Sequence, residues 1–328
     1  RIEGCGGCDW QHLAVAEQLP SKTGIVVDAL RRTARLADPG VRVGGAVPPT
    51  GYRTTIRVIG DEGGHASYRR ERSHDTVHAS GCLIAHPSLT AILDGLAIPT
   101  GVELSLRVSG ATGDMTALWD TGHGDVSGLP AHTGTGPTAS LVEVVAGHDL
   151  RVSAASFFQS GPRAAELLVD AVRRAAPELA TAEHVVDAYG GVGLFAATVV
   201  PAQSRVTLIE SSRVAVDDAR HNLAGRPADV VRAAVGDWHP DERDAVDVLI
   251  ADPSRTGLGK PGVATVARCA PAVVVLVSCD PVSLARDAGL LAAAGYRHDV
   301  TEVLDLFPHT HHVEAVTRFV PGPGRLGE

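Results

Sequence analysis

Hydrophobic positions divide the chain into three stretches with different spacing. In residues 14–36 they recur at helical intervals, which predicts an amphipathic helix whose start Pro20 is expected to delay. The apolar positions of that stretch are Leu19, Ile25, Val26, Leu30 and Leu36. From residue 41 to residue 152, short alternating runs are separated by Gly, Pro, Asp and Thr, which is typical of a β-rich segment.

The pattern changes after Phe157. Residues 164–176 have helical spacing, and apolar runs then recur between helices, at 184–187, 205–210, 230–234, 246–252, 273–278, 300–306 and 312–320. Such strands predict a mostly parallel sheet of seven strands that helices cover on both faces, an α/β fold of the Rossmann type. We therefore divide the chain into a cysteine motif with a helix (1–40), a β-rich central domain (41–152) and an α/β domain (153–328).

Composition excludes several classes of protein. The 328 residues contain no apolar run near the roughly 18 residues of a membrane span, and five unevenly spaced cysteines do not resemble a secreted disulfide framework. We expect a cytoplasmic monomer and, because the chain starts at Arg1 without Met or a signal-like segment, a fragment of a longer protein. The net charge of −9 argues against general nucleic-acid affinity, so an RNA site must be a local basic patch.

One segment, residues 52–72, has the composition of such a patch. Its arginines are interleaved with Tyr52 and Tyr68 in runs typical of paired strands. The candidate RNA contacts are Arg53, Arg57, Arg69, Arg70 and Arg72. A hairpin with ordinary solvated arginines explains this composition equally well.

A glycine-rich turn follows the first strand predicted after residue 157, in the run V-V-D-A-Y-G-G-V-G-L-F (185–195). Glycines there let a ligand approach the backbone, and Glu210, at the end of the next predicted strand, is placed to accept hydrogen bonds from both ribose hydroxyls of an adenosine. Gly191, Gly193 and Ala196 also satisfy G-x-G-x-x-A, so a nicotinamide dinucleotide site competes with a methyl-donor site, and a purely structural turn stays open.

Polar residues at the other strand ends favour the methyl-donor interpretation. Asp237 follows the third strand, Asp252 the fourth and Cys279 the fifth. Asp280-Pro281 after the cysteine predicts a helix start, where a thiolate nucleophile is favoured, although a lone cysteine after a strand is more often a buried structural thiol.

Glu314 lies within the last predicted strand. A carboxylate there is either paired in the core or placed to take a proton, since partial burial raises its pKa into a range useful for a general base. A metal site made with His309, His311 and His312 is disfavoured, because adjacent strand residues point to opposite faces.

These segments resemble the tRNA and ribosomal RNA uracil-5 methyltransferases along nearly the whole chain. The ordered landmarks are C-G-G-C-D-W-Q-H-L (5–13), Y-R, Y-R-R-E-R-S-H, F-F-Q (157–159), D-A-Y-G-G-V-G-L-F, D-P-S-R, S-C-D-P and H-H-V-E. The resemblance implies an S-adenosylmethionine-dependent enzyme with a Rossmann-like methyltransferase fold, acting on ribosomal RNA or tRNA, with Cys279 as nucleophile and Glu314 as base. It implies cofactor contacts at Gln159, Tyr189, Glu210 and Asp252.

Three positions depart from the family pattern. Asp280 replaces the usual Asn after the catalytic cysteine and puts a carboxylate near the thiol, although Asp and Asn cap helices about equally well. Ser254 stands where D-P-P-R has its second proline, and Gly190 replaces a cysteine after the motif tyrosine.

Cys5, Cys8 and Cys82 form a separate group of candidate metal ligands. In the ribosomal RNA branch, which the chain resembles most, similar cysteines with one more upstream bind a four-iron cluster, so the resemblance implies a 4Fe-4S site whose fourth ligand would precede Arg1. A zinc site completed by His86 or His12, and bare thiols, stay open.

Two other functions remain as alternatives. A catalytically inactive RNA-binding or assembly factor would keep the fold without needing Cys279 and Glu314, both of which this chain has. The alternative function of an NAD-dependent oxidoreductase is supported by the G-x-G-x-x-A match alone.

Overall fold

The computed structural model describes residues 4–241 and 245–323, which form two compact units. The first unit comprises the residues up to Val15, Val47–Ala165 and Phe307–His311. The second comprises Ala16–Ala46, Glu166–Leu306 and the residues from His312 onward. The three-part domain division from sequence stays a prediction.

The second unit is built on a sheet whose eight described strands lie in the order β1-β15-β16-β14-β13-β10-β11-β12. These strands are β1 (Val41–Ala46), β10 (His184–Ala188), β11 (Arg205–Glu210), β12 (Ala228–Arg232), β13 (Val248–Ala251), β14 (Val273–Ser278), β15 (Tyr296–Asp305) and β16 (Glu314–Pro321). Neighbours are parallel, except that β16 is antiparallel to both β14 and β15. The central strands are buried on both faces, as their continuous apolar runs predicted.

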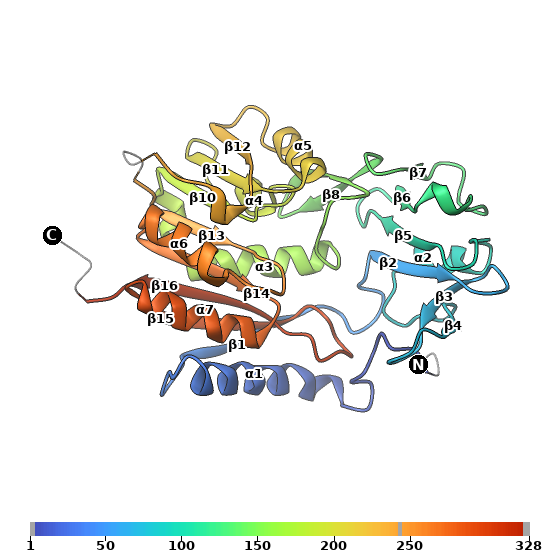
Figure 1. The fold of residues 1–328 in the computed structure, drawn as a ribbon, viewed down its shortest axis with the longest axis horizontal. Helices are drawn as coiled ribbons and strands as arrows, with labels where there is room; N and C mark the ends of the chain where they lie inside the picture. Colours follow the sequence, from blue (N-terminus) through green and yellow to red (C-terminus); the bar gives the residue numbers. More distant parts are fainter. Residues whose placement is uncertain (1–3, 242–244, 324–328) are drawn as a thin grey trace. The chain divides into compact units, whose positions relative to one another are not determined.

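Helices cover both faces of this sheet. They are α1 (Val15–Arg32), α3 (Pro162–Ala175), α4 (Leu194–Thr198), α5 (Arg213–Asn222), α6 (Gly259–Cys269) and α7 (Pro281–Ala293), with 3-10 turns η2 (Pro177–Thr181) and η3 (Val235–Asp237). One apolar cluster joins α1, α6 and α7 to alternate strand residues such as Val186, Leu249 and Val274, which therefore share one face. In Figure 1, α7 lies on the near side of the sheet and α3 on its far side.

Two expectations about the N-terminal part of this unit are wrong. Helix α1 begins at Val15 and keeps Pro20 inside it, because Gln18, Lys22, Val26 and Leu30 form one buried stripe that continues across the proline. The sheet has an eighth described strand because β1, which its spacing assigned to the β-rich segment, pairs in parallel with β15.

A buried ion pair fixes α1 to the end of β15. Lys22 Nζ lies 2.6 Å from Asp305 Oδ1, and both side chains are almost fully buried. Removing either side chain alone should destabilise the fold, because it would leave the other charge buried without a partner.

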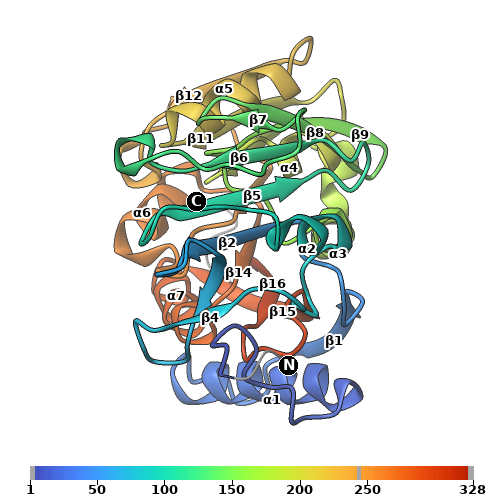
Figure 2. The same cartoon turned by 90° about the vertical axis from the view of Figure 1, so that its right-hand side faces the viewer.

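The first unit is β-rich, as its spacing predicted. Its six-stranded sheet has the order β4-β3-β2-β5-β6-β7, and Figure 2 shows β2, β5 and β6 side by side. The elements are β2 (Thr55–Gly60), β3 (Ala66–Arg69), β4 (Thr76–His78), α2 (Pro87–Leu93), β5 (Glu103–Val108), β6 (Met115–Leu118), η1 (Thr121–His123) and β7 (Gly134–Thr135), followed by the hairpin β8 (Ser140–Val145) and β9 (His148–Ser153). Helix α2 packs Leu89 and Leu93 against Ile56 and Leu104 on one face. Among the described helices, none combines the length and apolar character that a membrane crossing requires.

Candidate active site

The order of strands in the second unit reverses beside β10. From β10 the chain proceeds outward through β11 and β12 on one side, and through β13 and β14 on the other. Open α/β sheets bind ligands at such a switch point, outside the carboxyl ends of the strands. The antiparallel strand β16 begins at this same edge, which brings Glu314 there as well.

The turn after β10 has the backbone geometry of a ligand-binding loop. Tyr189, Gly191 and Gly193 all have positive φ angles, of 61°, 54° and 87°. A Cβ on Gly191 would meet no other atom within 4 Å, so the space beside this residue is open. The Tyr189 hydroxyl lies so close to Gly262 of α6 that a side chain there would meet it, which fixes the tyrosine against α6.

Glu210 at the end of β11 faces this turn. Its Oε2 accepts a hydrogen bond of 3.1 Å from the amide of Gly191, and its Oε1 accepts bonds from the amide of Ser212 at 2.7 Å and the hydroxyl of Ser211 at 3.2 Å. A carboxylate accepts about four hydrogen bonds. One position on Oε2 is therefore open for a ribose hydroxyl, and a second becomes available if the Ser211 hydroxyl turns away.

Asp187, at the end of β10, is fully buried beneath the turn. Its Oδ2 accepts a hydrogen bond of 3.0 Å from the amide of Ala196, while Oδ1 has no hydrogen-bond partner among the described residues. Burial raises the pKa of Asp187 to about 7, and the carboxylates of Asp252 and Glu210 add to the effect. The neutral form of this carboxyl group is therefore favoured relative to that of an exposed aspartate.

Cys279 and Glu314 are brought together by the β14–β16 ladder. Ser278 pairs with Ala315, so the residue after one strand lies beside the first residue of the other. Glu314 is 4% exposed, whereas Cys279 is only half-buried and accessible. Asp252 belongs to the same group, because it follows β13, which pairs in parallel with β14, and its charge acts on both Glu314 and Cys279.

The charges in this group shift both pKa values upward. Burial, followed by the Asp252 carboxylate, raises the pKa of Glu314 well above its usual value, as its apolar setting predicted. Burial also raises the pKa of the Cys279 thiol to about 11, with further contributions from Glu314 and Asp252, while Arg255 opposes them. The expected preference for the thiolate is therefore wrong for the free protein, because burial and two carboxyl groups outweigh the helix end.

Asp280 caps helix α7, as the Asp-Pro pair predicted. Its Oδ1 accepts a hydrogen bond of 2.7 Å from the amide of Ser283, and Pro281 is the first helical residue. The Asn-to-Asp departure thus leaves a satisfied N-cap next to the thiol. Asp237, predicted to contact the cofactor, is exposed at the end of η3.

Comparison with known proteins identifies the family. No protein-family model matches the chain. It is 31% identical over 351 residues to an uncharacterized RNA methyltransferase of Streptomyces avermitilis, across 97% of this chain and 81% of that protein. A similar protein of Streptomyces coelicolor is also 31% identical, over 97% of this chain and 76% of its own length. The chain belongs to the RNA methyltransferases.

A solved structure confirms the fold of this RNA methyltransferase. The tRNA (uracil-54, C5)-methyltransferase of Pyrococcus abyssi, crystallised with S-adenosyl-L-homocysteine, matches it with a TM-score of 0.73 and 25% identity. The match covers 97% of this chain and 86% of that one. The α/β methyltransferase fold expected from the sequence is therefore confirmed.

Gln159, the remaining predicted cofactor contact, belongs to the first unit of the RNA methyltransferase. It is buried in the F-F-Q segment, beside buried Phe158, whereas Phe157 is 73% exposed. Arg107 holds this segment by donating to the carbonyls of Ser153 and Ser156, at 2.9 and 2.8 Å. The exposed aromatic side chain was not singled out from sequence, because neighbouring phenylalanines do not reveal which one is buried.

The five candidate RNA-binding arginines of the RNA methyltransferase do not form one uncompensated patch. Arg57 and Arg69, on β2 and β3, both approach Glu103 of β5, at 3.9 and 3.4 Å. Arg72 lies 3.8 Å from Glu71, and Arg53 is half-buried. Arg70 is exposed, and its backbone pairs with Cys5.

The three candidate metal-binding cysteines lie in one neighbourhood of the first unit. Burial raises the pKa of Cys8 to about 11, and the nearby thiols of Cys82 and Cys5 add to the rise. Within the described ranges, however, no three His, Cys, Asp or Glu side chains are arranged to hold a metal ion. The assignment of these three thiols as metal ligands stays a prediction.

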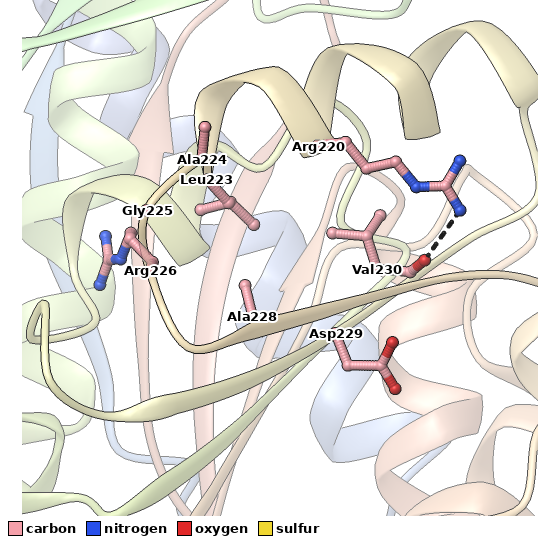
Figure 3. A pocket seen from close by; sticks show the side chains of 8 residues that line it. All are labelled: Arg220, Leu223, Ala224, Gly225, Arg226, Ala228, Asp229 and Val230. Carbon is pink, nitrogen blue, oxygen red and sulfur yellow. Dashed lines mark hydrogen bonds between the residues drawn. The ribbon is translucent and has the colours of Figure 1, made fainter.

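A hollow of about 410 Å³ elsewhere in the second unit is lined by arginines that bind backbone carbonyls (Figure 3). It lies between the end of α5 and β12, at the opposite edge of the sheet from Cys279. Arg220 donates to the carbonyl of Val230, and Arg226 donates to three carbonyls of residues 197–201. Its arginines thus brace the backbone.

Proposed function

We propose that this RNA methyltransferase transfers a methyl group from S-adenosylmethionine to carbon 5 of a uridine in ribosomal RNA or tRNA. The observation that carries the proposal is the placement of Cys279 beside Glu314 at the switch-point edge, next to the glycine turn and Glu210. The similarity to the tRNA (uracil-54, C5)-methyltransferase of Pyrococcus abyssi supports the same reaction.

The residues of the glycine turn are proposed to hold the methyl donor. Glu210 would bind the ribose, while Tyr189, Gly191, Gly193, Asp237, Asp252 and Gln159 complete the proposed set. The open space at Gly191 and the open acceptor position on Glu210 fit an adenosine. When bound, S-adenosylmethionine supplies an electrophilic methyl group on a positively charged sulfur.

Cys279 is proposed to activate the base. Carbon 5 of uracil is a weak nucleophile, and addition of the thiolate to carbon 6 makes it an enolate carbon able to take up the methyl group. The thiol must first lose its proton, and its raised pKa makes this step sensitive to neighbouring charge. Arg255 is the neighbouring cation that favours the thiolate.

Glu314 is proposed to complete the reaction. It must be ionised to take the proton from carbon 5, after which the bond between sulfur and carbon 6 breaks and the thiolate leaves. Burial makes its carboxylate a stronger base than an exposed glutamate. Stacking hides carbon 6, so we expect the target uridine to be flipped out or unpaired.

The RNA site and the metal site are proposals with separate tests. Arg53, Arg57, Arg69, Arg70 and Arg72 are proposed to contact RNA phosphates. A 4Fe-4S cluster is proposed only for a longer chain that supplies a fourth ligand, since the described residues do not form a metal site, and no reaction step is assigned to it. Iron analysis of such a chain, purified without oxygen, tests the cluster.

The test of the proposed reaction is methyl transfer from tritiated S-adenosylmethionine to total RNA that lacks 5-methyluridine. We expect label in 5-methyluridine after digestion of the RNA to nucleosides, and none with Cys279→Ala. Label in another nucleoside, or equal label with Cys279→Ala, would contradict the proposed chemistry.

A further inference from the structure

Asp287 of helix α7 is a fully buried carboxylate that the proposed reaction does not use. Its Oδ2 accepts a hydrogen bond of 2.7 Å from the amide of Leu258, and its Oδ1 accepts one of 3.1 Å from the amide of Gly259. These are the first amides of helix α6, which has no capping side chain of its own. Asp287 therefore caps α6 from a neighbouring helix.

Arg286 strengthens this connection. Its guanidinium donates to Asp287 Oδ1 at 2.7 Å and to the carbonyl of Thr256 at 2.6 Å. Arg286 and Asp287 of α7 thus bind the backbone at Thr256, Leu258 and Gly259, where the loop after β13 leads into α6.

The loop backbone also approaches α7 too closely for a side chain. Gly257 has a φ of 70°, and a Cβ there would collide with the carboxylate of Asp287 and come within 2.6 Å of Arg286 Nη2. A positive φ and close contact together require glycine at this position. Residues 256–259, the end of the loop 253–259, are consequently held against α7.

The same helix follows the nucleophile directly. Cys279 precedes the N-cap residue Asp280. Arg255 lies in the loop that follows β13, and β13 pairs in parallel with β14, the strand that ends just before Cys279. The positive charge of Arg255 lowers the pKa of the Cys279 thiol. Helix α7 therefore begins one residue after Asp280, next to the thiol, and its second turn contacts the loop that carries Arg255.

We propose that Asp287 is a positioning residue that fixes the loop 253–259 on helix α7 and thereby keeps Arg255 beside Cys279. This role rests on the proposed function of Cys279. It acts through the backbone of the loop, since the carboxylate bonds to two loop amides rather than to Arg255.

The test is the pH dependence of alkylation of Cys279 by iodoacetamide, followed by mass spectrometry of the peptide that contains it. We expect Arg255→Ala to raise the alkylation midpoint by up to about one pH unit, because an opposite charge is lost. Glu314 and Asp252, the carboxyl groups facing the thiol, are unchanged in these variants. Asp287→Asn should raise the midpoint similarly, and the double variant should show no further rise.

The matched control is Ser204→Ala, which removes a buried hydrogen bond of 2.6 Å to the carbonyl of Ala182 at the opposite edge of the sheet. It should lower the melting temperature and leave the midpoint unchanged. If Asp287→Asn behaves like this control, if its effect adds to that of Arg255→Ala, or if Arg255→Ala has no effect, the proposal is wrong.

A second variant covers the case in which Asp287→Asn does not fold. Arg286→Met removes the bond to Thr256 from a side chain that is 44% exposed, and should also raise the midpoint. An unchanged midpoint would then overturn the proposal. Alkylation needs neither RNA nor methyl donor, so failure of methyl transfer would count against the proposed function alone.

Discussion

Glu314 begins strand β16 directly beside Cys279, because Ala315 pairs with Ser278 across the antiparallel β14–β16 ladder. This places a buried carboxyl group and an accessible thiol at the same edge of the sheet. Two such groups can act at successive steps of one covalent reaction. The thiol forms the intermediate, and the carboxylate removes the proton that allows it to break down.

The two residues should therefore fail at different steps. Cys279→Ala should abolish both methylation and any covalent complex, whereas Glu314→Gln should still allow addition and methyl transfer but not release. We expect Glu314→Gln to lose roughly 10²–10⁴-fold in turnover and to accumulate a methylated RNA adduct that survives denaturing electrophoresis. Near-normal turnover by either variant would exclude the covalent mechanism assigned here.

The buried carboxyl group of Asp187 should make stability depend on pH. Its pKa is about 7 in the folded protein, above its ordinary value of 3.8, so the stability it contributes is present below pH 4 and lost as pH rises through 7. Relative to wild type, Asp187→Asn should gain on the order of 1–3 kcal/mol in unfolding free energy between pH 4 and pH 8. Urea titrations at the two values measure it, and equal differences at both would contradict the assignment.

Glu210→Ala should weaken binding of S-adenosylhomocysteine by about 1–3 kcal/mol, because ribose hydrogen bonds and the contact with the Gly191 amide are both lost. Calorimetry measures the change. Glu178→Ala, which removes a carboxylate bound to Arg318 in the same unit, serves as the control and should leave affinity unchanged. Unaltered affinity with Glu210→Ala would remove this residue from the cofactor site.

The Lys22–Asp305 pair should show strong coupling in a double-mutant cycle. Lys22→Met leaves a buried carboxylate without its cation and should cost about 3–5 kcal/mol of unfolding free energy. Adding Asp305→Leu should recover most of that loss, because neither charge then remains buried. Additive losses in urea unfolding would show that the two side chains do not act as a pair.

RNA binding should depend on Arg69 and Arg70, at the end of β3 and just after it. Arg69→Glu with Arg70→Glu should weaken binding and flatten its salt dependence by about one to two in log–log slope. Glu103→Gln, which releases Arg57 and Arg69, should strengthen binding instead. Arg31→Glu with Arg32→Glu, an equal charge change on α1, is the control. If it weakens RNA binding as much, Arg69 and Arg70 are not the contact.

The succession of strands and helices along the chain of the second unit could be predicted, because it depends on the local spacing of apolar residues. Each buried parallel strand has a continuous apolar run, and the Asp280-Pro281 pair marks the start of α7 without reference to distant residues. Glu314 could likewise be recognised from its apolar neighbours. For these features the local sequence contains the physical cause.

Partners distant in sequence could be found only in the tertiary structure. Three contacts join segments that lie 28 to 283 residues apart in the chain. They are the pairing of β1 with β15, the ion pair of Lys22 with Asp305, and the hydrogen bonds of Asp287 to the loop before α6. The raised pKa of Cys279 also could be found only in the tertiary structure, since the burial of its thiol depends on every segment packed around it. By itself the sequence determined which strands and reactive groups exist, while tertiary packing decided their neighbours and hence their charge, because desolvation and Coulomb energy depend on distance in space.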